Sequence, residues 1–287
     1  MARRSAVNGT NGTNGRPRPS ERFLAGLATA NAVAFVSHIH PDPDSLGSML
    51  GLSYLVESCL NKPTRLIRDG LISRAENRAM VELLEVEMDP IEEVTWRPGE
   101  VLVMVDSQPN TGRHTLDGDV PLYAVLDHHD TPGELVGIPF VDVRQDLGAT
   151  CSLVTSYLNE QHVEPTQRVA TALLYGIETE LSGYPREASE LDDNALIYLY
   201  PLADKDLLAR IRNARLPQSY FGCLVQALQS SFIYDRLIIS WVNDLPQPEL
   251  AAEVVDFLIR FEEVDWAVCA GVFQDKLILS VRAVLGR

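Results

Sequence analysis

Residues 32–48 read AVAFVSHIHPDPDSLGS, and three patterns meet in this segment. Its first six residues are apolar or small, as in a strand that is buried on both faces of a parallel sheet. A polar loop follows, and residues 45–60, SLGSMLGLSYLVESCL, then have the apolar spacing of a helix. The segment therefore predicts a strand, a polar loop and a helix. The acids and imidazoles of the loop are His38, His40, Asp42 and Asp44.

The same alternation of short apolar runs and helical patterns continues along the first two thirds of the chain. Each apolar run is followed at once by polar residues, which favours an α/β fold in which helices flank a parallel sheet. The further strands are expected at 64–69, 101–105, 122–126 and 138–141, and the helices at 75–84, 149–158, 166–175, 193–203 and 204–213.

A smaller α+β unit is expected towards the C-terminus, where strand and helix patterns alternate again. No helix pattern follows its last strand, so either that edge of the sheet is exposed or the unit is incomplete. Its elements are a strand at 237–242, a helix at 250–261 and paired strands at 266–273 and 276–283, joined by a turn at Gln274-Asp275. The chain as a whole divides into a disordered tail at 1–20, a catalytic domain at 21–200, a helical connector at 201–230 and a partial domain at 231–287.

Composition limits the classes of partner. The 287 residues are 46% hydrophobic, enough for two cores, and the formal net charge is −16. Such a charge repels long duplex nucleic acid, so a short nucleotide is the expected anionic partner. No apolar run is long enough for a membrane span, and the four cysteines have no zinc spacing. We expect a cytoplasmic protein with reduced thiols and no membrane partner.

Acids and imidazoles also follow two other expected strands. Asp106 follows one apolar run directly, and Asp127-His128-His129 follows the next, so that four of the six histidines lie in two short loops. The carboxyl ends of parallel strands form the ligand-binding edge of an open sheet. Because imidazoles and carboxylates meet at this edge, we expect a divalent metal site, and the mixture suits manganese better than calcium.

Two simpler interpretations of these residues are an EF-hand loop and a structural cap. An EF-hand is excluded, because Leu46 and Ser53 stand where that loop needs an Asp or Asn and a Glu. Asp106 alone would serve equally well as a cap of a helix or turn. The loops together favour the metal site, because no acid or imidazole interrupts the apolar runs.

Three motifs then occur in a recognisable order: H-x-x-P-D-x-D-x-x-G-S from His38 to Ser48, the strand-terminal Asp106, and the Asp-His-His triplet at 127–129. The chain resembles the DHH family of phosphoesterases in these motifs. A fourth motif, YGIETE at 175–180, resembles the family pattern G-I-x-T-D. The resemblance covers about residues 30–200, and it implies hydrolysis of a phosphate ester with two divalent metal ions, manganese first and magnesium as the alternative.

The resemblance also implies a role for each residue of the motifs. Asp106 would bridge the two ions, His129 would contact the substrate phosphate, and Asp127 would orient the neighbouring histidines. The implied ligands are His38, Asp42 and Asp106 for one ion, and Asp44, Asp106, His128 and Glu180 for the other.

The C-terminal unit resembles the DHH-associated substrate-binding domain of oligoribonucleases and 3′-phosphoadenosine 5′-phosphate phosphatases. The family signature S-x-R matches Ser280-Val281-Arg282, which implies that Arg282 and Ser280 bind a nucleotide phosphate across the cleft between the domains. The open alternative is that Arg282 is an ordinary strand arginine facing water.

Four departures from the family pattern set limits on activity. Glu180 stands where the family has Asp, His40 replaces an Asn and offers a further imidazole for metal or substrate, and Pro43 replaces a Gly. The family's G-G-G-H segment, which follows S-x-R and helps to bind substrate, is absent from this sequence. The first expectation is a phosphoesterase for short oligonucleotides or 3′-phosphoadenosine 5′-phosphate. The alternatives are a catalytically impaired nucleotide or metal binder and an inorganic pyrophosphatase, and a homodimer is left open.

Overall fold

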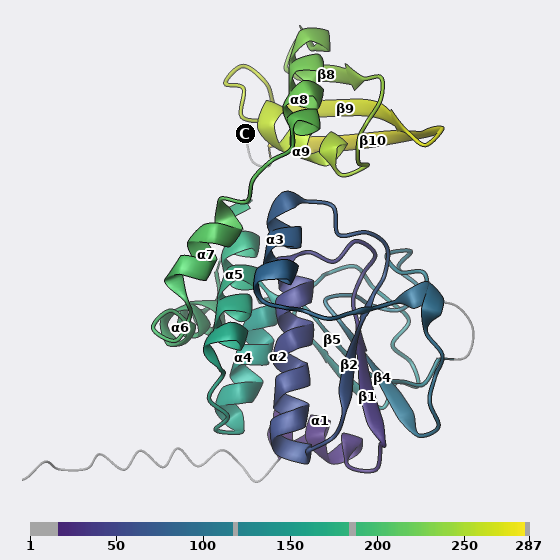
Figure 1. Ribbon diagram of the computed structural model, residues 1–287, viewed down its shortest axis with the longest axis vertical. Coiled ribbons are helices and arrows are strands. Elements are labelled where there is room, and N and C mark those ends of the chain that lie inside the picture. The colour runs from purple at the N-terminus through teal and green to yellow at the C-terminus, as the bar shows by residue number, and fades with distance from the viewer. Residues whose placement is uncertain (1–16, 117–119, 184–187, 285–287) are drawn as a thin grey trace, which may run out of the picture.

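A computed structural model of the chain describes residues 17–116, 120–183 and 188–284. It contains two sheets, each with its own hydrophobic core (Figure 1). The larger sheet is parallel and has helices beside it, and the smaller sheet lies in a second unit. The expected α/β class with a smaller α+β unit is therefore confirmed.

The larger sheet has six strands in the order β3-β2-β1-β4-β5-β6, and every described pair is parallel. The order reverses between β1 and β4, so the carboxyl ends of these two neighbours border the crevice where such sheets bind ligands. The strands are β1 Ala32–Val36, β2 Thr64–Arg68, β3 Asp89–Pro90, β4 Glu100–Val105, β5 Leu122–Asp127 and β6 Phe140–Val143.

Helices α2, α4 and α5 pack against one another over one face of this sheet (Figure 1). The other face is covered by side chains of connecting segments, among them Trp96, Leu116 and Leu135. None of the helices in the described ranges is long and apolar enough to cross a membrane. The helices of this unit are α1 Pro19–Leu27, α2 Pro43–Leu60, α3 Ala75–Leu83, the short 3-10 helix η1 Ile91–Glu93, α4 Thr150–Glu160, α5 Gln167–Gly183, α6 Glu190–Leu199 and α7 Lys205–Arg212.

The second unit is a four-stranded sheet in the order β10-β9-β8-β7, with α8 and α9 packed on one face. The β9–β10 hairpin turns at Gln274 and Asp275, both with positive φ, as tight hairpin turns require. The elements are α8 Gln218–Ser230, β7 Phe232–Tyr234, β8 Leu237–Val242, α9 Leu250–Leu258, β9 Trp266–Phe273 and β10 Lys276–Ala283.

Several boundaries differ from those expected. Helix α1 begins at Pro19, inside the segment 1–20 that we expected to be a tail, because Phe23 and Leu27 bury themselves in the core; residues 1–16 lie outside the described ranges. Helix α5 continues past its expected end at Tyr175, and strand β7 was not expected. Within the expected connector, α7 contributes to the first core and α8 to the second.

Candidate metal centre

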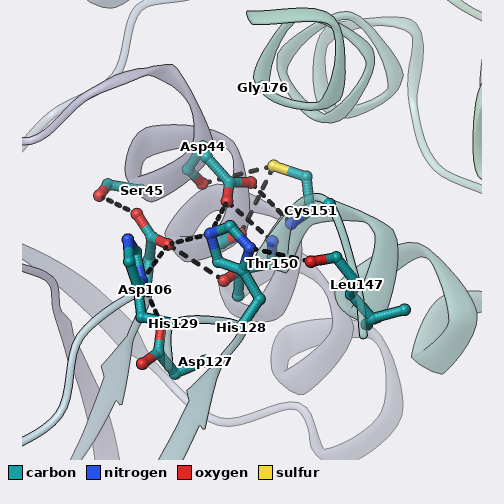
Figure 2. A network of polar contacts seen from close by, with 12 residues as sticks. Asp44, Ser45, Asp106, Asp127, His128, His129, Leu147, Thr150, Cys151 and Gly176 are labelled. Carbon is teal, nitrogen blue, oxygen red and sulfur yellow. Dashed lines mark hydrogen bonds and ion pairs between the residues drawn. The ribbon is translucent and has the colours of Figure 1, made fainter. Parts of the chain in front are cut away.

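Side chains from the carboxyl ends of three adjacent strands converge on one place. Figure 2 shows those at the ends of β4 and β5. His38 follows β1, Asp106 follows β4, and His128 and His129 follow β5. Asp106 has a positive φ of 54°, and its N–H donates to the Leu126 carbonyl at 2.9 Å. This strained turn directs the Asp106 carboxylate between the histidines of its two neighbouring strands.

Two groups of three ligand atoms meet at Asp106. One group is His38, Asp42 and Asp106, the other is Asp106, His128 and His129, and within each group the atoms lie within 4.8 Å of one another. The fold thus brings together residues of the first motif, the second motif and the Asp-His-His triplet. Asp106 is the residue that both groups share, as a bridging ligand must be.

The atoms of the first group are separated by distances that suit a shared cation. Nε2 of His38 lies 3.4 Å from Oδ2 of Asp42 and 3.5 Å from Oδ2 of Asp106. These gaps are too long for good hydrogen bonds. Two atoms so spaced can both reach one ion at the ~2.0–2.2 Å typical of small divalent cations.

The second group has the same spacing around His128. Its Nε2 lies 3.4 Å from Oδ1 of Asp106 and 3.6 Å from Oδ2 of Asp44. Asp44 is fully buried beside this group, although it belongs to neither set of three. Nε2 of His128 therefore faces the carboxylates of both Asp44 and Asp106, and their joint role as metal ligands stays a prediction.

Backbone carbonyls fix which nitrogen of each histidine faces the carboxylates. Nδ1 of His38 lies 2.8 Å from the Ile39 carbonyl. Nδ1 of His128 lies 3.2 Å from the Leu147 carbonyl, as Figure 2 shows. A carbonyl only accepts, so each Nδ1 carries the proton and each Nε2 turns a lone pair towards carboxylate oxygens. Nε2 of His38 is moreover buried without a hydrogen-bond partner among the described residues. This donor set fits divalent cations.

The carboxylates around His38 favour a positive charge in this pocket. Burial alone would lower the pKa of His38, but Asp106 and Asp42 raise it to about 11. Burial would likewise raise the pKa of Asp106, but His128 and His38 hold it well below its usual range. The pocket therefore favours a cation at Nε2 of His38, which a proton or a metal ion can supply.

Asp44 is held by the start of a helix. Its two carboxylate oxygens accept the N–H groups of Thr150 and Cys151, each at 2.7 Å, at the N-terminus of α4. Burial and the neighbouring charge of Asp106 nevertheless raise the pKa of Asp44 well above its usual range. The helix terminus thus orients the carboxylate that lies beside His128.

The ligand-bearing start of α2 is in close contact with α5. A Cβ atom on Gly176 would lie 2.9 Å from the Pro43 carbonyl oxygen, and one on Gly47 would lie 2.8 Å from the Ala172 carbonyl oxygen. Only glycine lets these two backbones approach so closely. The glycines of the first and fourth motifs therefore set the position of Asp44.

Gln108 organises the Asp-His-His triplet at 127–129, and it was not among the site residues expected from the sequence. This buried side chain donates through Nε2 to Oδ2 of Asp127 at 2.8 Å and to the His129 carbonyl at 3.2 Å. Its Oε1 accepts the Gly133 N–H at 3.0 Å. Asp127 in turn lies 2.8 Å from Nδ1 of His129, which is the orienting contact expected of it. A position two residues after the strand-end acid is the only sequence signal for Gln108.

Comparison with known protein families now adds an independent result. Residues 32–177 match the DHH family, N-terminal domain, which is half of the chain and includes both ligand groups. The chain belongs to the DHH family. Members of this family are phosphoesterase hydrolases that use divalent metals.

Three curated DHH relatives were found. The uncharacterized protein MJ1633 of Methanocaldococcus jannaschii is 28% identical over 249 residues, covering 86% of this chain and 51% of the relative. The cyclic-di-AMP phosphodiesterase PdeA of Listeria monocytogenes is 25% identical, covering 95% and 44%. The bifunctional oligoribonuclease and PAP phosphatase NrnA of Thermus thermophilus is 28% identical, covering 82% and 71%. The chain thus spans about half the length of the first two relatives.

A solved structure supports the DHH fold. An exopolyphosphatase-related protein from Bacteroides fragilis superposes with a TM-score of 0.70 at 17% sequence identity, and the match covers 93% of this chain and 83% of that protein. At this identity the likeness concerns the fold alone.

The fourth DHH motif lies on α5, and its acid is near the metal centre without joining either ligand group. The charge of Glu180 is one of the causes that raise the pKa of Asp44, so the two carboxylates interact. Glu180 is nevertheless absent from both sets of three ligand atoms. Its expected role as a metal ligand stays a prediction.

The residues expected to bind substrate belong to neither of the two ligand groups. His40 has a positive φ of 61°, and its Nδ1 accepts the Leu71 N–H at 3.0 Å and lies 3.4 Å from Oε1 of Glu249, the N-cap residue of α9. Arg282 pairs with Asp256 of α9 at 2.8 Å. Ser280 lies opposite Cys269 in the β9–β10 hairpin. The roles of all three in substrate binding remain predictions.

Proposed function

We propose that this DHH protein hydrolyses a phosphoester bond of a short nucleotide, either a linear dinucleotide or 3′-phosphoadenosine 5′-phosphate, with two manganese ions. The observation that carries the proposal is the position of Asp106, whose Oδ2 lies 3.5 Å from Nε2 of His38 and whose Oδ1 lies 3.4 Å from Nε2 of His128. A shared carboxylate is what two cations ~3.5–4 Å apart require.

Each residue of the centre would bind either a metal ion or the substrate. His38, Asp42 and Asp106 would hold one ion, and Asp106 and His128 the other, beside Asp44. Two divalent ions held there would supply the chemistry of a two-metal site, which is a lowered pKa of a water molecule and stabilisation of charge on the leaving oxygen. Asp127 holds the proton of His129 on Nδ1, which leaves Nε2 of His129 to contact the substrate phosphate.

The size and charge of the substrate follow from two further points. The named activities of PdeA and NrnA concern cyclic di-AMP, oligoribonucleotides and PAP, all of them small adenylate or oligonucleotide esters. A net charge of −16 disfavours a long polyanion. Arg282 would exchange Asp256 for a substrate phosphate, since a guanidinium binds both carboxylate and phosphate well.

A hydrolysis assay tests the proposal. The purified chain with manganese is incubated separately with a linear diadenylate, 3′-phosphoadenosine 5′-phosphate, cyclic di-AMP and pyrophosphate. We expect AMP from the first two, and a loss of at least ~100-fold in Asp106→Asn, since even outer partners of a metal ligand are worth 10–100-fold. The exposed Asp235→Asn is the control and should keep full activity. No turnover of any of these esters would reject the proposal, and turnover of pyrophosphate alone would favour a pyrophosphatase.

The second candidate is a nucleotide or metal binder without turnover, which the position of Glu180 outside both ligand groups favours. The substitution Glu180→Asp separates the two candidates. Activity in Glu180→Asp but not in the parent chain supports the binder, and activity in the parent chain rejects it.

A further inference from the structure

Ser45, in the first turn of α2, hydrogen-bonds to two carboxylates at once. Its hydroxyl donates to Oδ2 of Asp106 at 2.7 Å (Figure 2), and its backbone N–H donates to Oδ1 of Asp42 at 3.0 Å. The same two carboxylates lie beside Nε2 of His38, at 3.5 Å and 3.4 Å. Ser45 therefore sets the positions of both acids of the first ligand group, although it is not a metal-ligand type itself.

Thr150, the first residue of α4, makes the corresponding pair of bonds in the second group. Its hydroxyl donates to Oδ1 of Asp106 at 3.1 Å, and its backbone N–H donates to Oδ2 of Asp44 at 2.7 Å (Figure 2). Both carboxylates lie beside Nε2 of His128, at 3.4 Å and 3.6 Å. Two residues on different helices thus hold Asp106, one at each oxygen.

Burial and the number of protons fix the direction of these hydrogen bonds. Ser37, Ser45 and Thr150 are fully buried, so bulk water does not compete for their hydroxyl groups. An ionised carboxylate only accepts, so Ser45 and Thr150 each give their single hydroxyl proton to Asp106. Oγ of Ser37 lies 2.6 Å from Oγ of Ser45 and donates to it, since Ser45 has no second proton. This row of hydroxyl groups is polarised towards the carboxylate, which strengthens its last bond.

The hydroxyl groups leave one acceptor position on each oxygen of Asp106. A carboxylate oxygen has two lone pairs, and a hydroxyl group takes one of them at Oδ1 and one at Oδ2. Besides its hydroxyl donor, Oδ2 has Nε2 of His38 as a neighbour, and Oδ1 has Nε2 of His128. One lone pair thus stays available beside each histidine.

We infer that Ser45 and Thr150 are positioning residues of the metal centre, each of which directs one oxygen of Asp106 to one ion. Ser45 acts on the ion beside His38, and Thr150 acts on the ion beside His128. Without these two donors the carboxylate is free to rotate and to turn both oxygens to the same ion. The inference rests on the proposed two-metal centre, but it does not depend on which ester the protein hydrolyses.

Calorimetric titration of manganese into variants that keep a single ion tests this assignment. Asp42→Ala removes a ligand of the first group, so the ion that stays is the one beside His128. In this background we expect Thr150→Val to weaken manganese binding ~10–100-fold, as the loss of outer partners of metal ligands does. Ser45→Ala should leave the affinity of this background unchanged.

The reverse background is His128→Ala, in which the ion that stays lies beside His38. There Ser45→Ala should weaken manganese binding ~10–100-fold, and Thr150→Val should leave it unchanged. A loss of general stability would lower the affinity alike in both backgrounds, so this exchange of effects is specific to positioning.

Two further variants are matched controls. Thr150→Ser keeps the hydroxyl group and should keep the affinity of its background. Thr155→Val removes a buried hydroxyl of the same helix, which donates to the Cys151 carbonyl at 2.7 Å, and should leave manganese binding unchanged. Thermal unfolding without metal checks that each variant folds, and Thr150→Ala replaces Thr150→Val if that variant does not.

The results that would overturn the inference are equally definite. They are equal effects of Ser45→Ala and Thr150→Val in the two backgrounds, no effect of either, or a parent chain that binds no manganese. The titrations contain no substrate, so they are separate from the hydrolysis assay. A chain that binds manganese in the expected pattern but cleaves no ester supports the inference and rejects the proposed hydrolysis.

Discussion

Gln108 is a neutral residue that holds two ionisable ones in place. Replacing it with alanine removes its hydrogen bonds to Asp127 and to the carbonyl of His129. We expect Gln108→Ala to lower turnover ~10–100-fold, as the loss of outer partners at metal sites does. Stability should fall by only ~1–3 kcal/mol, for the buried groups left without partners. Steady-state kinetics and thermal unfolding measure both effects.

The control for this variant is Gln161→Ala. Gln161 donates to Ser20 at 2.8 Å, far along α4 from its ligand-holding N-terminus. It should lose stability in the same range without a change in turnover. Equal losses of turnover in the two variants would show that Gln108 acts only through general stability.

Single residues of the centre were predictable from sequence when their type and position agreed. His38, Asp106 and His128 are metal-ligand types that directly follow apolar runs, and the structure places all three together. Gln108 could not be found in this way, because a neutral amide after a strand has no ligand signature. The hydrogen bonds that hold the Asp44 carboxylate could not be predicted either. Their N–H donors belong to Thr150 and Cys151, which lie far from Asp44 in the sequence.

At the scale of elements, the contact between α2 and α5 fixes the ligand-bearing loop. A methyl group on Gly176 would lie 2.9 Å from the Pro43 carbonyl oxygen and 3.1 Å from Cα of Asp44. We expect Gly176→Ala to destabilise the protein by ~1–3 kcal/mol through overpacking, and to weaken metal binding because α2 must shift. Thermal unfolding with and without manganese measures this.

The matched control is Gly222→Ala, also within a helix. A Cβ atom there meets nothing within 4 Å. This substitution should stabilise the protein by ~0.5–1 kcal/mol, the ordinary gain of alanine over glycine in a helix. A gain of stability in both variants would contradict the tight contact between α2 and α5 at Gly176.

Elements with a regular spacing of apolar residues were predicted well from the sequence. Elements that depend on tertiary contacts were not. The strands that end at Val105 and Asp127 have continuous apolar runs, and the hairpin at Gln274-Asp275 has its turn chemistry. Strand β7 was missed because it has only three residues, Phe232–Tyr234, directly after a helix. Helix α5 was predicted too short, since its last turns contain Glu178 and Glu180 and lack a continuous apolar face.

At the scale of the whole molecule, acidic groups concentrate where the two units meet. Glu253 of α9 lines a pocket there together with Arg78 and Leu216. Burial raises its pKa, and Glu76 adds to the effect while Arg74 opposes it. Because the folded pKa lies above the ordinary value of 4.5, the stabilising contribution is complete below that value and is lost as pH rises through the folded pKa.

We therefore expect Glu253→Gln to raise the melting temperature at neutral pH, because it removes a buried charge. The gain should vanish near pH 4.5, where the parent carboxyl is protonated. Thermal unfolding across this range checks the sign, with the exposed Glu263→Gln as the control. A gain that stays constant with pH would contradict the assignment.

The measurement that bears most directly on the shared carboxylate is calorimetric titration of manganese into the purified chain. We expect two ions per parent chain, one in Asp42→Ala, because Asp42 belongs to a single ligand group, and none in Asp106→Ala at the same concentrations. Full binding of two ions by Asp106→Ala, or a parent chain that binds no manganese, would contradict the assignment of Asp106 as the bridge.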